Sequence, residues 1–221
     1  RGWGTGDLAS RGAAEDGAGV AAVEPASAML DLARAKPGGD AVTWIEADAR
    51  DLDLGRRFDL IVMTGHAFQT LLTDEDRARG LAAIARHLAP GARFVFDSRN
   101  PAHREWQAWR PELSRRRIHD PVLGPVMAWN DADWDQEPAV VTYETAYEVV
   151  SDGETFRAVS RIAFPALGKL ERQISPAGLV VAAWHGDWRG APLGTDSPEV
   201  IPFGRGASPS APHCRPNAAF P

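Results

Sequence analysis

Cysteine is nearly absent from this sequence, because only Cys214 occurs among its 221 residues. No disulfide can form within the chain, which fits a reducing compartment, so we expect a cytoplasmic protein. Long apolar runs are missing too, since none approaches the roughly 20 residues of a membrane-spanning helix. No signal peptide is visible, and we predict no membrane partner.

Positive charge is also scarce. The chain has 24 Lys and Arg residues against 30 Asp and Glu residues, which gives a formal net charge of −6. Binding a nucleic-acid backbone requires a clustered basic face, and we interpret the basic run at 114–117 as a solvated loop. We therefore predict no nucleic-acid partner. We also predict no metal site, and the composition leaves the oligomeric state undetermined.

Residues 18–100 alternate between apolar runs typical of strands and amphipathic runs typical of helices. Thr73 is the predicted N-cap of one helix, and Pro90 with Gly91 its predicted end. The run 58–65 is nearly all apolar, which is typical of a strand buried on both faces of a parallel sheet. We predict strands at 19–24, 41–48, 58–65 and 92–100, and helices at 25–36 and 73–91. This alternation predicts an α/β fold with a doubly wound parallel sheet.

The pattern changes after residue 100. Two runs, 139–150 and 154–164, alternate with period two and are joined by a Ser-Asp-Gly turn, which predicts an antiparallel hairpin. The stretch before the hairpin has no regular pattern and contains Trp106, Trp109, Trp129 and Trp134. We interpret it as an insertion or lid.

The patterns divide the chain into four regions. Residues 1–100 are the predicted ligand-binding β/α half, and 101–165 the Trp-rich lid and hairpin insertion. Residues 166–203 are predicted to complete the sheet with a helix and strands, although Pro202 argues against a regular last strand. Residues 204–221 have no periodicity, and we predict that they are disordered.

Glycines open the chain, at Gly2, Gly4 and Gly6. Glycine allows positive φ and close approach of a ligand, and a Gly-rich turn between a strand and a helix is the usual cradle for a nucleotide. The chain lacks the strand that should lead into this turn and an initiator Met. We therefore expect the natural N-terminus, with the first and central strand of the sheet, to precede residue 1.

Two acids come at the ends of predicted strands. Glu24 ends the first of them and Asp48 the second. In an open parallel sheet, ligands bind beyond the carboxyl ends of the strands, where a carboxylate can accept both hydroxyls of a ribose. Glu24 fits that role. Asp48 has no counterpart in the dinucleotide-binding pattern and is placed where an adenine amino group can donate to it.

The sequence resembles the class I S-adenosylmethionine-dependent methyltransferases. GWGTG is similar to their Gly-rich motif, VEPASAML to their ribose-binding segment, EADARDL to the segment of their adenine-contacting acid, and FDLIVMTGHAFQ to their fourth strand and following loop. The resemblance covers residues 1 to about 100, with the four motifs in the family's order. It implies a Rossmann-like methyltransferase sheet with a hairpin or lid insertion, and S-adenosylmethionine as cofactor.

The resemblance also implies a set of site residues. The glycine turn lies under the methionine part of the cofactor, and Glu24 holds the ribose. The adenine region is bordered by Met29, Asp48 and Ala49, and the methyl-transfer crevice by Met63, Thr64 and His66. The acceptor is a small molecule, over which the Trp-rich segment closes.

His66 is the candidate general base, because the unperturbed pKa of histidine is near 6.5 and a hydroxyl or ammonium acceptor must lose a proton. A structural or merely cofactor-lining histidine remains an alternative for this position.

Two other functions remain open at this point. Gly4, Gly6 and Ala9 also satisfy G-x-G-x-x-A, the pattern of nicotinamide-dependent oxidoreductases, which explains Glu24 but gives Asp48 no role. The second alternative is a binding module, with a methyltransferase-like fold that no longer catalyses.

Overall fold

The computed structural model describes residues 7–16, 19–133 and 140–207. Gly2, Gly4, Gly6 and Trp134 lie outside them, as does the predicted tail from residue 208 onward. Helices α1, α2, α3, α4 and α5 are Asp7–Asp16, Ser27–Arg34, Asp74–His87, Pro111–Ser114 and Leu167–Ile174. Short 3-10 helices are η2 (Gly39–Ala41), η3 (Ala67–Thr70), η4 (Pro101–His103), η5 (Glu105–Ala108) and η6 (Ser175–Ala177).

Eleven strands of the described chain form the sheets. They are β1 (Val20–Glu24), β2 (Val42–Glu46), β3 (Phe58–Met63), β4 (Leu88–Phe96), β5 (Ser98–Arg99), β6 (Arg116–Asp120), β7 (Gly124–Asp133), β8 (Val140–Val149), β9 (Thr155–Ala163), β10 (Leu179–His185) and β11 (Glu199–Gly206). This is a mixed α/β fold that combines parallel strands with an antiparallel four-stranded insertion sheet. None of the described helices is both long and apolar enough to cross a membrane.

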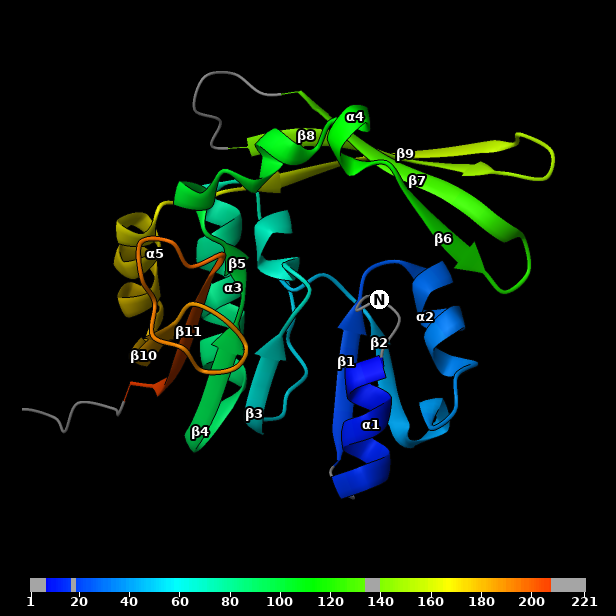
Figure 1. The fold of residues 1–221 in the computed structure, drawn as a ribbon. Helices are drawn as coiled ribbons and strands as arrows, with labels where there is room; N and C mark the ends of the chain where they lie inside the picture. The colour runs from blue at the N-terminus through cyan, green and yellow to red at the C-terminus, as the bar shows by residue number, and fades with distance from the viewer. Residues whose placement is uncertain (1–6, 17–18, 134–139, 208–221) are drawn as a thin grey trace, which may run out of the picture.

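The parallel strands place their carboxyl ends on one side. β1 pairs with β2 in parallel, and β3 pairs with β4 in parallel, so that Met63 lies opposite Phe96. β11 runs antiparallel to β4 and to β10, which gives the order β10-β11-β4-β3. The arrowheads of β1, β3 and β4 all point toward the antiparallel sheet (Figure 1). The first residue of β11 therefore lies at the same edge as the last residues of β3 and β4.

The facing edges of β1 and β3 have no partner strand among the described residues. The sequence predicted a strand at 58–65 buried on both faces, and this is wrong for β3. Ile61 and Met63 pack against the core, but Leu60 and Val62 on the other face are 55% and 38% exposed. The described part of the chain supplies neither a helix over that face nor a strand along that edge.

A strand supplied between β1 and β3 is expected to stabilise the protein. Each unpaired buried backbone group costs about 1 to 3 kcal/mol, so pairing a few of them raises the melting temperature by roughly 5 to 10 °C. In the test, a segment of about 30 residues that carries an apolar strand is fused to the N-terminus of the protein. This length suffices for one strand and its connection. A Gly/Ser segment of equal length is the control, and equal melting temperatures for the two fusions would show that this slot accepts no strand.

Helix α3 begins as predicted and ends earlier. The Thr73 hydroxyl accepts a hydrogen bond from the backbone N–H of Asp76 (3.0 Å), and the Asp76 carboxylate accepts one from the Thr73 N–H (3.1 Å). The predicted end at Pro90 and Gly91 is wrong, because β4 starts at Leu88 and contains both. Pairing with β3 already begins at Leu88, so the ladder ends the helix before the proline is reached.

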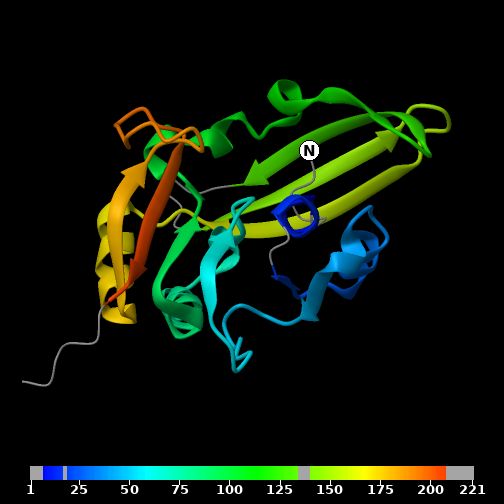
Figure 2. The same cartoon turned by 90° about the horizontal axis from the view of Figure 1, so that it is seen from below.

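The antiparallel sheet has the order β6-β7-β8-β9 and lies across the carboxyl ends of the parallel strands (Figures 1 and 2). The predicted hairpin is confirmed as β8 and β9. The two strands before it were missed: β6 reads RRIHD and exposes nearly all of its side chains, so it has no apolar alternation. The basic run at 114–117, interpreted as a loop, in fact leads into β6.

The last strand also corrects the prediction. β11 extends through residues 199–206 despite Pro202, so that residues 204–206 belong to the sheet and not to a tail. β11 pairs with β4 only from Phe203 onward, which leaves the proline nitrogen outside that ladder. A Cβ at Gly204 would lie 2.2 Å from the Val180 carbonyl oxygen and 2.6 Å from the Phe94 ring, so this close approach requires glycine.

Candidate functional site

The predicted site residues inside the described chain gather at the carboxyl ends of three parallel strands. Glu24 ends β1, Asp48 and Ala49 follow β2, and Met63, Thr64 and His66 end or follow β3. Met29 is half-buried on α2, the helix that follows β1. Their assignment to a bound cofactor stays a prediction, but their common edge agrees with the expected location of a ligand site.

Glu24 has one carboxylate oxygen engaged by the chain. Its Oε1 accepts a hydrogen bond from the backbone N–H of Ala26 (3.0 Å), which orients the half-buried side chain. Oε2 forms no hydrogen bond within the described residues and can accept from a ligand hydroxyl.

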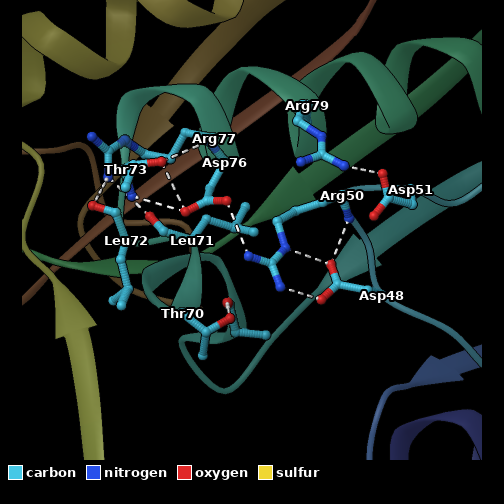
Figure 3. A network of polar contacts seen from close by, with 11 residues as sticks. Asp48, Arg50, Asp51, Thr70, Leu71, Leu72, Thr73, Asp76, Arg77 and Arg79 are labelled. Atoms are coloured by element: carbon cyan, nitrogen blue, oxygen red, sulfur yellow. Dashed lines mark hydrogen bonds and ion pairs between the residues drawn. The ribbon is translucent and has the colours of Figure 1, made fainter.

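Asp48 is held by an arginine that sequence analysis overlooked. The Arg50 backbone N–H and Nε donate to Asp48 Oδ1 (2.8 and 2.9 Å), and Nη2 donates to Oδ2 (2.6 Å). Nη1 of the same guanidinium donates to Asp76 Oδ1 at the start of α3 (3.0 Å). Arg79 pairs with Asp51 beside them (Figure 3). Arg50 thus fastens the loop after β2 to α3, so Asp48 has a structural role whether or not it also contacts adenine.

These contacts predict a pH-dependent contribution to stability. Hydrogen bonds from the Arg50 side chain hold the pKa of Asp48 below its ordinary value of 3.8, and they also lower the pKa of Asp76. A lowered pKa in the folded state means that the stabilisation is present above the unfolded value and is lost as the pH falls through the folded value.

Arg50→Ala is therefore expected to destabilise the protein only slightly at neutral pH, since these side chains are partly exposed and screened by solvent. The difference from wild type should shrink as the pH is lowered below the ordinary Asp pKa of 3.8. Urea unfolding at several pH values measures it, with Arg93→Ala on β4 as the control. A difference that does not change with pH would contradict the assignment.

His66 lies in a polar cluster beyond the ends of β3 and β4. Its Nε2 lies 2.9 Å from Glu199 Oε1 and 3.0 Å from Oε2, at the first residue of β11. Its backbone N–H donates to Asp97 Oδ1 (2.8 Å), and the indole N–H of Trp188 donates to Asp97 Oδ2 (3.2 Å). The φ angle of His66 is +62°, a left-handed conformation that the Asp97 contact fixes. Asp97 therefore holds the backbone of His66, and Glu199 holds its ring.

Burial sets the protonation chemistry of Asp97. This residue is 2% exposed, and desolvation raises the pKa of its carboxyl, although the contacts with His66 and Trp188 act in the opposite direction. Asp97 was not among the predicted site residues, yet it comes just after β4 as Asp48 comes just after β2, so the same signal was present. Glu199 had no such signal, because it lies 133 residues from His66 and only the antiparallel return of β11 brings it there.

The described structure is thus an α/β protein that carries carboxylates and one histidine at the edge where a ligand site is expected. Comparisons with known proteins agree with this class. The family model described as "Methyltransferase domain" matches residues 1–91. The cypemycin N-terminal methyltransferase of a Streptomyces species is 37% identical over 101 residues, which cover 46% of this chain and 41% of that protein. The match thus spans less than half the length of this curated relative.

Solved structures share the fold over most of the chain. The CcbJ methyltransferase from Streptomyces caelestis matches with a TM-score of 0.76 and 21% identity, covering 94% of this chain and 82% of the other. CalS10, a SAM-bound amino pentose methyltransferase from Micromonospora echinaspora, matches with a TM-score of 0.63 and 22% identity, covering 85% and 74%. Residues 1–91 are thus similar to S-adenosylmethionine-dependent class I methyltransferases, and the rest of the chain shares the fold of solved methyltransferases. This similarity disfavours the nicotinamide-dependent alternative.

Proposed function

We propose that this protein transfers the methyl group of S-adenosylmethionine to a nitrogen atom of a small-molecule acceptor. One observation carries the proposal: Glu24, Asp48 and His66 each lie at or just after the carboxyl end of a parallel strand, in a chain whose residues 1–91 match the methyltransferase domain. Nitrogen as the acceptor atom is favoured by the names of two proteins of similar fold, the sugar N-methyltransferase KedS8 and the glycopeptide N-methyltransferase MtfA.

The described residues suit this cofactor chemically. The Glu24 carboxylate keeps one oxygen for ribose hydroxyls, and the loop with Asp48 and Ala49 borders the position proposed for adenine. When bound, the cofactor supplies a methyl group already activated by its sulfonium. The protein mainly has to align donor and acceptor, exclude water and remove a proton from the acceptor. His66 is the residue that we assign to the proton.

Calorimetric titration with S-adenosylhomocysteine, NAD and NADP tests the cofactor. The proposal expects saturable binding of the first ligand and none of the other two. Binding of a nicotinamide nucleotide in place of S-adenosylhomocysteine would overturn it. Tight S-adenosylhomocysteine binding without transfer to any acceptor would instead support a non-catalytic binding module.

Glu24→Ala is expected to weaken S-adenosylhomocysteine binding by about 2 to 3 kcal/mol, because hydrogen bonds to a charged group contribute roughly that much. Asp48→Asn should cost less, since the amide keeps an acceptor oxygen. Glu46→Ala is a matched control, because Glu46 pairs with Glu24 in the β1–β2 register but is exposed. Equal affinities for wild type and Glu24→Ala would remove Glu24 from the ribose site.

A further inference from the structure

The contact between His66 and Glu199 defines which ring nitrogen of His66 is basic. Nε2 lies within hydrogen-bond distance of both carboxylate oxygens of Glu199, and an ionised carboxylate can only accept. Nε2 therefore carries the proton of the neutral ring, and the lone pair lies on Nδ1. Nδ1 forms no hydrogen bond within the part of the chain that the structure describes. The two side chains are 22% and 20% exposed, so solvent and ligands can reach this pair.

The charged surroundings of His66 are acidic. Asp97 faces its backbone from the end of β4, and Glu199 faces its ring from β11. Arg99 lies opposite Glu199 in the β5–β11 register, but its guanidinium binds Gln69 (3.0 Å) and Glu105 (3.0 Å). Glu199 thus keeps its carboxylate for His66, where the charge stabilises a proton that the ring takes up.

We propose that Glu199 is a positioning residue for methyl transfer, which fixes the tautomer of His66 so that Nδ1 accepts the proton of an ammonium acceptor. The inference rests on the proposed function and extends it to a second residue. The acceptor nitrogen gives one proton to Nδ1, and its freed lone pair forms the bond to the methyl group. The electron pair of the broken sulfur–methyl bond returns to sulfur. Glu199 stabilises the imidazolium until the proton leaves to solvent.

The tautomer can be measured without an acceptor. Nitrogen-15 NMR of histidine-labelled protein separates protonated from unprotonated ring nitrogens, and the spectrum of His66→Asn assigns the His66 signals among the six histidines. The proposal expects a protonated Nε2 and an unprotonated Nδ1 at high pH. It also expects the preference for a protonated Nε2 to weaken in Glu199→Gln, because the amide can donate as well as accept. A proton on Nδ1 of the neutral ring in wild type, or an unchanged tautomer ratio in Glu199→Gln, would overturn the proposal.

Kinetics with a tetrapeptide that has a free N-terminal amine, and with an amino sugar, give the second readout. Glu199→Gln should lower kcat by at least about tenfold at neutral pH and move the acidic limb of the pH profile to lower pH. The double variant His66→Asn/Glu199→Gln should be no slower than His66→Asn alone, because Glu199 acts through His66. Additive losses would contradict this.

Glu171→Gln, an exposed change on α5, is the control and should match wild type. S-adenosylhomocysteine affinity should be equal in all these variants. If wild type does not bind S-adenosylhomocysteine, the proposed function is refuted. If binding is normal but the pH profile of Glu199→Gln is unshifted, only the role of Glu199 is refuted.

Discussion

Replacement of His66 by asparagine is expected to lower kcat for methyl transfer by on the order of 10²-fold at neutral pH, because a positioned general base contributes at least that much. Asparagine is the suitable substitute. The φ angle of +62° at this position is left-handed, and asparagine is among the residues that tolerate it best. The backbone N–H that donates to Asp97 is retained in the variant.

Affinity for S-adenosylhomocysteine and the melting temperature should change little in His66→Asn, so that the loss is confined to the transfer step. Steady-state kinetics, calorimetry and a thermal melt on the same preparation check this. If kcat stays within about twofold of wild type, His66 is a structural or lining residue and not the base.

Replacement of Trp106 by alanine is expected to destabilise the protein by about 3 to 5 kcal/mol, the range found for large buried aromatic side chains. Trp106 is 5% exposed, and its ring centroid lies 4.5 Å from that of Phe164. Trp109 is 7% exposed and packs into the same cluster, with Val141 and Ile162. The melting temperature should fall by at least roughly 6 °C.

The burial of Trp106 and Trp109 favours a packing role over the lid role expected from the sequence. A side chain that covers the acceptor would change KM for the acceptor and leave stability intact, whereas Trp106 and Trp109 belong to the core between η5 and the antiparallel sheet. Trp129 is the useful comparison, because it is half-buried, with the Arg115 guanidinium carbon 4.9 Å from its ring centroid. Trp129→Ala should cost less stability. A stable Trp106→Ala variant with a raised KM would restore the lid interpretation.

Local chemistry made much of the fold predictable. Strands β1 to β4 follow from their apolar runs, and the start of α3 from the capping pair of Thr73 with Asp76, because both signals act over a few residues. The end of α3 was not predictable from Pro90, since pairing of Leu88 with β3 depends on a distant segment. β6 was missed for a related reason: its sequence has no apolar face, and its pairing with β7 defines it.

The candidate site was predictable where it depends on strand ends. Glu24, Asp48 and His66 were identified because each follows an apolar run, and the structure places each at a carboxyl edge. The contacts of those residues were not predictable. Arg50 engages Asp48 through a local turn, and Glu199 reaches His66 only through the antiparallel course of β11.

Transfer of a labelled methyl group from S-adenosylmethionine to a free amine tests the central claim most directly. The protein is incubated with methyl-labelled cofactor and either the tetrapeptide or the amino sugar, and product and S-adenosylhomocysteine are quantified together. We expect label on the acceptor nitrogen, one S-adenosylhomocysteine per methyl group transferred, and a rate that falls on the order of 10²-fold in His66→Asn. Formation of S-adenosylhomocysteine without a labelled acceptor, or a labelled product at the same rate in His66→Asn, would contradict it.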